Sequence, residues 1–362
     1  MKHVILPLIL ALGLSLSLQA QEYRYTEAAD LNLIGKVFPD TPHPYHRIDT
    51  ARYKGFSAGE IARLIESAGV IVAFKTDSPS IQIKTVYGAH IYRGGSATGF
   101  SIKGYDLYIR KDGRWLWAGA GMPNEDHPDE PFKLIADMDG SEHECLLYLP
   151  VRAEVLSVQI GVEDGASLEP MENPFRYRIC VHGSSYTHGV STSRSGMAWP
   201  SIFARETGLQ TLNLGVSGRC KMQSYFAAAL AEAPDVDAFI FDAFSNPSVE
   251  EIETRLFPFI EAMQAAHPGK PLIFLKTIYR EKRNFNTQVE ADEAARMAAS
   301  VRMMKEACKK YPDVYFITTT NATSPERETT VDGTHPDDYG YTLWAHSVEK
   351  PILKILKKYG IR

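Results

Sequence analysis

The second half of the chain alternates short β-prone apolar runs with longer segments of helical periodicity, and this alternation limits the fold more than any other feature. Strand and helix patterns that alternate in this way indicate parallel strands joined by helical crossovers. We therefore predict a doubly wound parallel sheet of five strands with helices on both faces. The predicted strands are residues 177–182, 211–214, 236–242, 272–276 and 314–317. The predicted helices are residues 198–207, 222–233, 249–266, 289–310 and 339–358.

The first half of the chain has a different rhythm. From about Tyr23 to Glu172, short strand patterns stand between turn signals, and only residues 57–68 look helical. Many short strands with this spacing favour a β-sandwich of jelly-roll type. Two prolines in residues 169–174 interrupt the pattern, so we place a sandwich domain at 21–174 and the α/β domain at 175–362. The clearest sandwich strands are residues 70–75, 81–84, 104–110 and 144–149.

The first twenty residues have the pattern of a secretory signal peptide. Lys2 and His3 precede an apolar run over residues 4–18, which ends at Ala20-Gln21. The run is short for a membrane span, and neither a stop-transfer pattern nor a lipoprotein cysteine follows it. We therefore predict a signal peptide at 1–20 and an exported protein, periplasmic or extracellular, without a membrane anchor.

Charge and cysteine content exclude several classes of protein. The formal net charge of −5 offers no basic surface for nucleic acid. Four scattered cysteines in 362 residues do not form a disulfide framework, although export leaves the state of these thiols open. No Cys/His cluster has metal-ligand spacing, and His182 and His188 lack a third ligand. We therefore predict no metal site, and the sequence leaves the oligomeric state open.

A candidate nucleophile follows the first strand of the predicted parallel sheet. The strand ends in Gly183-Ser184-Ser185, and a second glycine follows at Gly189. A strand that breaks into a tight turn and re-enters as a helix lifts a small side chain to the carboxyl edge of the sheet. By itself this stretch is equally consistent with an ordinary Gly-Ser loop. The catalytic interpretation depends on Asp332-Gly-Thr-His335-Pro336, which precedes the last helix.

Several polar groups converge on the same sheet edge. Residues 213–218 follow the second strand, and residues 242–246 follow the third. Because ligands bind beyond the carboxyl ends of parallel strands, these groups and residues 332–336 are expected to meet there. This convergence is harder to obtain by chance than any single motif. Together the stretches indicate a serine hydrolase.

Acyl transfer requires a nucleophile, a base, a group that orients the base, and donors for the oxyanion. We assign Ser185 as nucleophile and His335 as general base and later general acid, a role that suits the unperturbed pKa of histidine, about 6.5. Asp332 would accept the imidazole N–H of His335 and fix its tautomer. The predicted oxyanion donors are the backbone N–H groups of Ser185 and Gly218 and the side-chain amide of Asn246.

These residues resemble the SGNH (GDSL-like) hydrolases, which are named for Ser, Gly, Asn and His in four sequence blocks. Gly183-Ser184-Ser185 matches the first block, residues 213–218 the second, Asn246 the third, and residues 332–336 the last. The first block departs from the family at Ser184, where Asp is usual. The third is also looser, because Ser245-Asn246-Pro247 replaces Gly-x-Asn-Asp. Neither departure removes a residue to which we assign a catalytic role.

The resemblance extends over nearly the whole mature chain. Gly104-Tyr-Asp-Leu-Tyr108 resembles the GxDLY signature of β-sandwich modules that precede SGNH domains, and Trp199-Pro200 also recurs in this family. The resemblance implies a jelly-roll-like sandwich followed by a flavodoxin-like, three-layer α/β/α hydrolase domain. It also implies hydrolysis of an ester, often an O-acetyl group on a carbohydrate, without cofactor or metal. Composition and spacing do not indicate the substrate class.

Two other functions stay open. A lipase or thioesterase acting on longer acyl chains would need an apolar channel, which a sequence does not display. A carbohydrate-binding protein with a non-catalytic hydrolase domain would not need all of Ser185, Gly218, Asn246, Asp332 and His335.

Some further residues have both a functional and a structural interpretation. Trp115 and Trp117 could form a sugar-stacking surface, but alternating strand positions favour a core role for at least one of them. Cys220 and Tyr186 are weak candidates for the acyl pocket. Three cationic residues after the fourth strand could meet the substrate, although a solvated loop explains them equally well; they are Lys276, Arg280 and Arg283.

Overall fold

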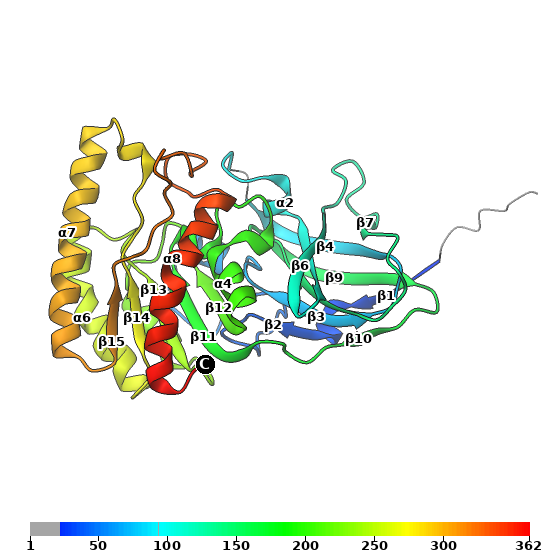
Figure 1. Cartoon of the computed structure of the whole chain (residues 1–362), viewed down its shortest axis with the longest axis horizontal. Helices are drawn as coiled ribbons and strands as arrows, with labels where there is room; N and C mark the ends of the chain where they lie inside the picture. The colour runs from blue at the N-terminus through cyan, green and yellow to red at the C-terminus, as the bar shows by residue number, and fades with distance from the viewer. Residues whose placement is uncertain (1–21, 93) are drawn as a thin grey trace, which may run out of the picture.

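The computed structural model describes residues 22–92 and 94–362 (Figure 1). The predicted signal peptide lies outside the described residues. Within them, no helix has the length and apolar character needed to cross a membrane.

The N-terminal domain consists of two antiparallel sheets that pack face to face. The first sheet has the strand order β1 (Tyr23–Glu27), β9 (Ala153–Glu163), β4 (Ile81–Ile91), β7 (Phe132–Ile135). The second has the order β10 (Leu168–Pro170), β3 (Ile71–Thr76), β8 (His143–Tyr148), β5 (Tyr105–Lys111), β6 (Arg114–Gly121), with β2 (Asn32–Ile34) also paired to β3. Short helices lie at η1 (Ala28–Asp30), α1 (Ala58–Leu64) and α2 (Gly99–Ile102).

Alternating side chains of the two sheets fill the core between them. Val72 and Phe74 of β3 meet Ile81 and Ile83 of β4 and Ile160 of β9, and all five are fully buried. This two-residue periodicity is what a pleated strand with one buried face requires. The predicted β-sandwich is confirmed.

The C-terminal domain is built on five parallel strands. Their order is β12 (Leu209–Gly215), β11 (Arg176–Gly183), β13 (Ala238–Asp242), β14 (Leu272–Leu275), β15 (Val314–Ile317). The first strand in sequence, β11, lies inside the sheet between β12 and β13. The order of the strands therefore reverses next to β11, and ligands of such sheets bind at this kind of reversal.

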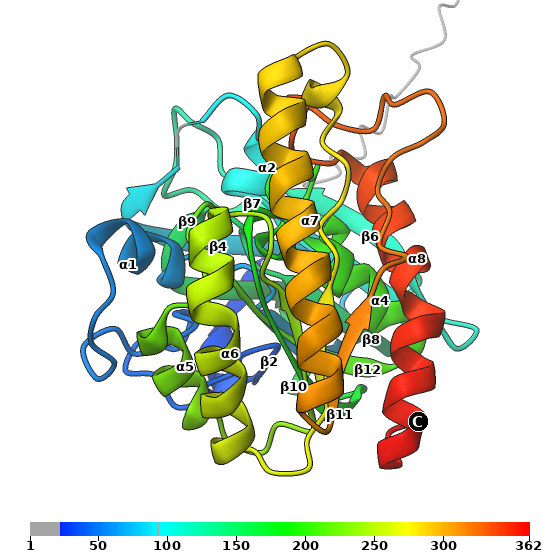
Figure 2. The same ribbon diagram turned by 90° about the vertical axis from the view of Figure 1, so that its left-hand side faces the viewer.

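Helices cover both faces of this sheet (Figure 2). One face packs against α5 (Ser224–Ala231), α6 (Val249–Ala266) and α7 (Thr287–Lys310), and the other against α4 (Trp199–Thr207) and α8 (Asp338–Leu356). Neighbouring residues of β13 point to opposite faces, so Phe239 and Phe241 enter the first core and Ile240 the second. The predicted three-layer α/β/α domain is confirmed. Short helices η3 (Glu281–Arg283) and η4 (Lys357–Tyr359) complete the domain.

The five strands and five helices predicted for this domain are all present, with ends that differ by at most two residues. Ser248 and Glu251 form a capping box at the start of α6. The helix continues from Val249 to Ala266 through Pro258. The short helix α3 (Ser185–His188) follows β11.

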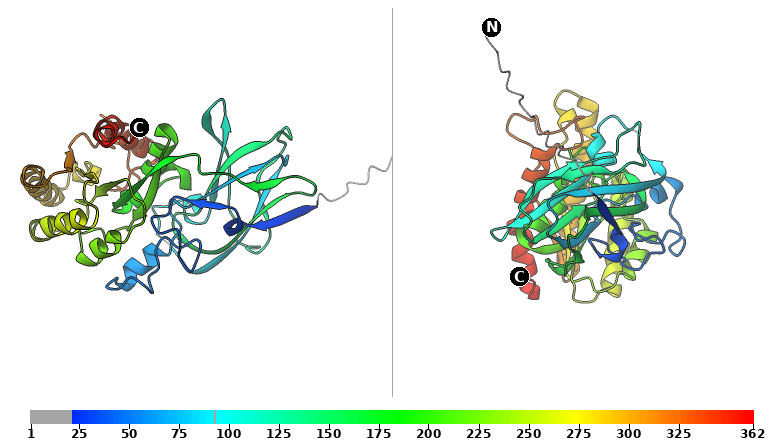
Figure 3. Two further views of the ribbon diagram at one scale, coloured as in Figure 1. Left: turned by 90° about the horizontal axis from the view of Figure 1, so that it is seen from below. Right: turned by 90° about the vertical axis from the view of Figure 1, so that its right-hand side faces the viewer.

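The two domains share part of one hydrophobic core. Residues 35–64, between β2 and the end of α1, leave the sandwich and lie along the C-terminal domain, where α1 lies near α5 (Figures 2 and 3). Val37, Phe38 and Leu64 belong to the same buried cluster as residues of α5 and β12. A methyl group at Gly69 would lie 2.4 Å from the Cβ of Asn213, so the two backbones meet as closely as a glycine permits.

Asp106 of the Gly-x-Asp-Leu-Tyr motif joins the domains at a second place. Its buried carboxylate accepts hydrogen bonds from Arg194 Nη1 at 2.8 and 3.0 Å and from the backbone N–H of Gly196 at 2.8 Å. Burial raises the pKa of Asp106, although the charge of Arg194 acts in the opposite direction. The motif therefore connects a sandwich strand to the loop that precedes α4.

Candidate active site

Ser185 lies at the turn between β11 and α3, at the carboxyl edge of the sheet. Ser184 is the N-cap of α3, and Gly189 ends the helix in the left-handed conformation with a φ of 93°. The turn before the serine is crowded, since a Cβ at Gly183 would lie 2.1 Å from Thr187 Oγ1. The sequence therefore places a small, 5% exposed serine at the N-terminus of a helix, where backbone N–H groups point toward it.

His335 and Asp332 reach Ser185 from the loop before α8. His335 Nε2 lies 3.0 Å from Ser185 Oγ, and His335 Nδ1 lies 2.7 Å from Asp332 Oδ2. Because a carboxylate only accepts, Nδ1 carries the proton and Nε2 is free to accept from the serine hydroxyl. The His335 side chain is 20% exposed, so a ligand can approach the Ser–His pair.

Asp332 also shapes its own turn. Its Oδ1 accepts backbone hydrogen bonds from Thr334 at 2.9 Å and from His335 at 2.8 Å. Partial burial alone would raise the pKa of Asp332, but the hydrogen bonds from the His335 ring and from these two N–H groups hold it well below its usual range. The aspartate is therefore a fixed anion beside the imidazole.

The candidate oxyanion donors lie on two neighbouring loops. Gly218 adopts a left-handed φ of 73° in a turn that a hydrogen bond from Arg219 N to Val216 O closes at 2.9 Å. Asn246 Oδ1 accepts from Cys220 N at 3.2 Å, which leaves the Nδ2 group of Asn246 available to another acceptor. Across residues 22–92 and 94–362, the N–H groups of Ser185 and Gly218 have no hydrogen-bond acceptor.

A buried carboxylate lies beneath the nucleophile turn. Asp242 Oδ2 accepts from the backbone N–H of Ser184 at 3.0 Å, from Ser184 Oγ at 2.6 Å and from Thr187 Oγ1 at 3.2 Å. Burial raises the pKa of Asp242 to about 6, although these hydrogen bonds oppose the shift. Ser184 replaces the aspartate usual in this motif, and the neighbouring strand provides a carboxylate at that point instead. The sequence analysis placed Asp242 at this edge but assigned it no role.

Other residues considered from the sequence are structural. Tyr186, Cys220, His182 and His188 are all buried, so they support the site from within and do not line an open acyl pocket. Arg280 is also buried and does not face a substrate, since it donates to Tyr186 Oη at 2.7 Å, to Glu293 Oε1 at 2.6 Å and to the Ser245 carbonyl at 2.6 Å. No group of three or more potential metal ligands occurs in the described part of the chain.

The two tryptophans of β6 differ from the expectation that one or both belong to the core. Trp117 is 55% exposed, with its Nε1 donating to Asp106 at 3.0 Å, and the Arg194 guanidinium carbon lies 5.3 Å from its ring centre. Trp115 is half-buried and packs against Phe175. The two rings lie on the same face of β6 because they are two residues apart in the strand, and that face is turned away from the sandwich core.

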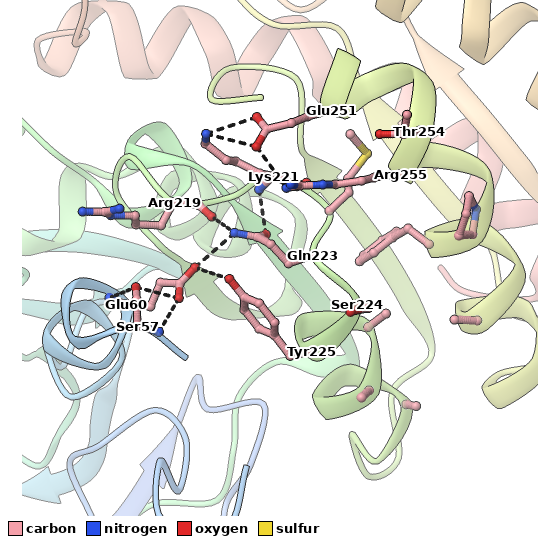
Figure 4. A pocket seen from close by; sticks show the side chains of 17 residues that line it. Ser57, Glu60, Arg219, Lys221, Gln223, Ser224, Tyr225, Glu251, Thr254 and Arg255 are labelled. Carbon is pink, nitrogen blue, oxygen red and sulfur yellow. Dashed lines mark hydrogen bonds and ion pairs between the residues drawn. The ribbon is translucent and has the colours of Figure 1, made fainter. Parts of the chain in front are cut away.

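A groove of about 660 Å³ begins beside the Gly218 turn and lies between α1, α5 and α6 (Figure 4). Lys221 and Arg255 share the carboxylate of Glu251, each at 3.1 Å. Arg219, the residue after Gly218, is exposed and forms no ion pair or hydrogen bond through its side chain within the described residues. The rim of this groove therefore offers hydrogen-bond donors within a few residues of the candidate oxyanion site.

A doubly wound sheet that carries Ser, His and Asp in hydrogen-bond contact at its carboxyl edge is the architecture of an α/β serine hydrolase. Comparisons with known proteins make the assignment more specific. The profile of the GDSL-like lipase/acylhydrolase family matches residues 176–354, and that of the N-terminal domain of SGNH hydrolase-type esterases, GxDLY, matches residues 23–168. A sequence comparison with curated proteins finds no match.

Solved structures agree with these matches. A GDSL-like lipase from Bacteroides ovatus is 37% identical, with a TM-score of 0.88 over 93% of this chain and 98% of its own. A salicylyl-acyltransferase from a tetracycline biosynthetic pathway shares the fold; it is 19% identical, with a TM-score of 0.72 over 94% of this chain and 99% of its own. A family two carbohydrate esterase from Cellvibrio japonicus also shares the fold; it is 11% identical, with a TM-score of 0.59 over 93% of this chain and 99% of its own. The chain belongs to the GDSL-like lipase/acylhydrolase family and carries a GxDLY-type N-terminal domain. It is an SGNH-type enzyme that hydrolyses esters.

Proposed function

We propose that the protein is an exported serine esterase that removes short acyl groups, in particular O-acetyl groups, from carbohydrates through Ser185, His335 and Asp332. The observation that carries this proposal is the continuous set of contacts from Asp332 Oδ2 to His335 Nδ1 at 2.7 Å and from His335 Nε2 to Ser185 Oγ at 3.0 Å. These are distances at which proton transfer between the groups is direct.

In the first half of the reaction, Ser185 Oγ attacks the ester carbonyl while its proton moves to His335 Nε2. Asp332 stabilises the imidazolium that forms and keeps the ring in position. The carbonyl oxygen becomes an oxyanion, which the N–H groups of Ser185 and Gly218 and the amide of Asn246 would receive. The C–O bond to the alcohol then breaks, and His335 gives its proton to the leaving oxygen, which leaves an acyl-Ser185 ester.

In the second half, water replaces the alcohol. His335 Nε2 takes a proton from the water as its oxygen attacks the acyl carbon, and the same oxyanion donors act again. When the second tetrahedral intermediate collapses, the bond to Ser185 Oγ breaks and Oγ regains the proton from His335. The products are the free alcohol and a carboxylic acid, and no cofactor enters the balance.

The groove between α1, α5 and α6 supports a polyhydroxyl alcohol as the leaving group. Arg219, Lys221 and Arg255 at its rim can donate hydrogen bonds to sugar hydroxyls, and Glu251 can accept hydrogen bonds from them. The floor of the groove also carries apolar side chains, including Met222, Ala227 and Phe259, so esters of longer acids are tested beside acetate. The family two carbohydrate esterases, which share the fold, make acetylated glycans the first substrates to test.

The test is hydrolysis of p-nitrophenyl acetate against p-nitrophenyl esters of longer acids, by the wild type, by Ser185→Ala and by the control Ser141→Ala. Ser141 is an exposed sandwich residue and should be neutral. We expect the acetate to be preferred and Ser185→Ala to abolish turnover without loss of fold. Preference for long chains would instead indicate a lipase or thioesterase. Retention of most activity by Ser185→Ala would refute the mechanism, and glycan binding without Ser185-dependent turnover would indicate a non-catalytic domain.

The proposed general base also predicts the pH profile. A histidine acts as general base only when its ring is unprotonated, so activity should fall toward acidic pH under conditions where chemistry limits the rate. A flat profile between pH 5 and 8 would argue against a histidine base.

Export is the remaining part of the proposal, and it depends on the sequence of residues 1–20. Expression of the full chain in a bacterial host should yield a processed protein outside the cytoplasm with a new N-terminus near Gln21. An unprocessed protein in the cytoplasmic fraction would contradict it.

A further inference from the structure

His188 connects the sandwich domain to the turn that carries Gly218. Its Nδ1 accepts the backbone N–H of Ser217 at 3.3 Å. On the other side of the ring, Nε2 lies 2.9 Å from Glu66 Oε2 and 3.1 Å from the carbonyl oxygen of Val151, which accepts its hydrogen bond. Glu66 and Val151 both belong to the N-terminal half of the chain. Because an N–H group can only donate, Nδ1 is unprotonated and the single ring proton is on Nε2.

His188 is neutral and Glu66 is ionised in this cluster, for different reasons. Burial, followed by the nearby charge of Arg47, lowers the pKa of His188 to about 3, so the ring is neutral at ordinary pH. Burial also opposes the ionised form of Glu66, but its contacts with His188 and His90 and the charge of Arg152 hold the pKa of Glu66 well below its usual value. Glu66 Oε2 has no hydrogen-bond partner of good geometry and points at the Nε2 side of the ring.

The turn has little freedom apart from this contact. A Cβ at Gly215 would lie 2.2 Å from the His188 backbone nitrogen, so strand β12 passes directly against α3 before the turn begins. The Val216 N–H then donates to the Gly183 carbonyl at 2.8 Å. Ser217 is the next residue, and its N–H reaches His188. The following N–H, that of Gly218, is the candidate oxyanion donor.

We propose that His188 is a positioning residue of the oxyanion site: anchored by Glu66 and Val151 of the sandwich domain, it holds the Ser217 N–H and thereby sets the direction of the Gly218 N–H. This inference rests on the proposed esterase function. It assigns the sandwich domain a part in the chemistry that does not depend on binding glycans. His188 touches neither the nucleophile nor the base, so it acts only through the turn.

Two substitutions test the two ring nitrogens of His188 one at a time. Asn at position 188 keeps an acceptor near the place of Nδ1 but does not reach Glu66 and Val151. Gln keeps a donor near the place of Nε2 but loses the acceptor for Ser217. Complete loss of one oxyanion donor costs about 10²–10³-fold in kcat, and a misdirected donor should cost part of that. We expect His188→Gln to lower kcat by roughly 10–100-fold with KM changed less than about 3-fold, and His188→Asn, whose acceptor is no longer anchored to the sandwich domain, to lower kcat by a smaller factor of about 3–10-fold.

The control is Asp106→Asn, which weakens the other contact between the domains without touching the Gly218 turn. It should lower the melting temperature as much as the His188 variants do and leave kcat within about 2-fold, since Asp106 contacts no residue of the Gly218 turn. The pH profile of the His188 variants should match that of the wild type, because His335 and Asp332 are unchanged. Labelling of Ser185 by a fluorophosphonate gives a second rate that needs no natural substrate.

Three results would overturn the inference: equal losses of kcat in His188→Asn and His188→Gln, a loss confined to KM, or a loss of kcat in Asp106→Asn that follows its loss of stability. Failure of the proposed function itself looks different. In that case the wild type would neither hydrolyse esters nor react with the fluorophosphonate at Ser185, and no variant would be informative about His188.

Discussion

In the proposed mechanism, Asp332 acts through the orientation of its carboxylate more than through burial. Three hydrogen bonds, two from backbone N–H groups and one from the imidazole, hold its carboxylate in one direction. The Asp332→Asn side chain keeps its shape, but its amide can donate to His335 Nδ1 as well as accept from it. The ring is then no longer held with its proton on Nδ1, which is the tautomer whose Nε2 accepts from Ser185. We expect kcat to fall roughly 10³–10⁴-fold, as for comparable triads. Steady-state kinetics with p-nitrophenyl acetate measure this, and a fall below 10-fold would contradict the assigned role.

Asp242 makes stability depend on pH at the nucleophile turn. Its pKa in the folded protein, about 6, is above the ordinary value of 3.8, so the native state binds this proton more tightly than the unfolded state. Its contribution is therefore most favourable below about pH 4 and is lost as the pH rises through about 6. The free energy involved is on the order of 3 kcal/mol.

In Asp242→Asn, the amide oxygen can accept from Ser184 while the amide nitrogen donates to Ser245 Oγ. We expect this variant to gain stability relative to the wild type as the pH rises from 4 to 7. Chemical denaturation at several pH values measures the difference. If the difference in free energy of unfolding between the variant and the wild type stays constant from pH 4 to 7, Asp242 does not titrate in that range.

At the level of single residues, a sequence indicates candidate reactive groups more readily than the residues that support them. Acyl transfer limits which residue types can act, so the sequence nominates Ser185, Asp332, His335, Gly218 and Asn246, and their roles stay predictions. Hydrogen bonds join three of these residues, Ser185, His335 and Asp332. The roles of Asp242 and His188 were not found, since a buried carboxylate or imidazole has no sequence pattern of its own and depends on neighbours distant in the chain.

Among the elements, the loop that carries Asp332 and His335 is held by the short helix η3. Glu281 Oε1 accepts from the N–H of Thr329 at 2.8 Å, and Oε2 accepts from Thr330 Oγ1 at 2.6 Å. The Lys282 N–H donates to the Gly333 carbonyl at 2.8 Å. Partial burial would raise the pKa of Glu281, but the hydrogen bonds from the two threonines lower it.

Glu281→Gln should loosen this loop, because an amide replaces one of two accepting oxygens. The carboxylate contributes stability above its ordinary pKa of 4.5, and this contribution is lost as the pH falls through its lowered folded value. We expect a 5–50-fold loss of kcat, on the order expected when a reacting group is misplaced, and less acid sensitivity than the wild type. Steady-state kinetics measure kcat, and melting temperatures at several pH values measure the acid sensitivity. If kcat and acid sensitivity both equal those of the wild type, η3 does not position His335.

Prediction of elements from sequence succeeded best in the α/β domain. Its main helices are long enough to show a clear periodicity, and its strands are continuous apolar runs between those helices, so each pattern has one interpretation. In the sandwich, four strands were specified (β3, β4, β5 and β8), and β1, β2, β6, β7, β9 and β10 were not. Strand β9, for example, shifts its register twice against β4, and such irregularities interrupt the alternation that a sequence pattern needs.

For the whole molecule, the shared core predicts that neither half folds alone. Removing residues 22–174 would expose the surface of α5 and β12 that Val37, Phe38, Ile48 and Leu64 cover, and would leave Gly215 and Asn213 without the guanidinium of Arg47. Each large buried side chain contributes about 1.5–3 kcal/mol. We expect residues 175–362 alone to aggregate or melt without cooperativity, and a soluble, active fragment would refute this.

The path of residues 35–64 also bears on how such enzymes diversify. A domain attached by a linker can be exchanged for another by recombination at the linker. Here residues 35–64 would be exchanged together with the sandwich, although they form part of the core of the C-terminal domain. Arg47 in this segment also donates a hydrogen bond to the Gly215 carbonyl, near the nucleophile turn. Chimeras that replace the sandwich should therefore work only when this segment stays with the hydrolase half. The two modules follow one another in sequence, but residues 35–64 tie their interiors together, so they exchange only as a pair.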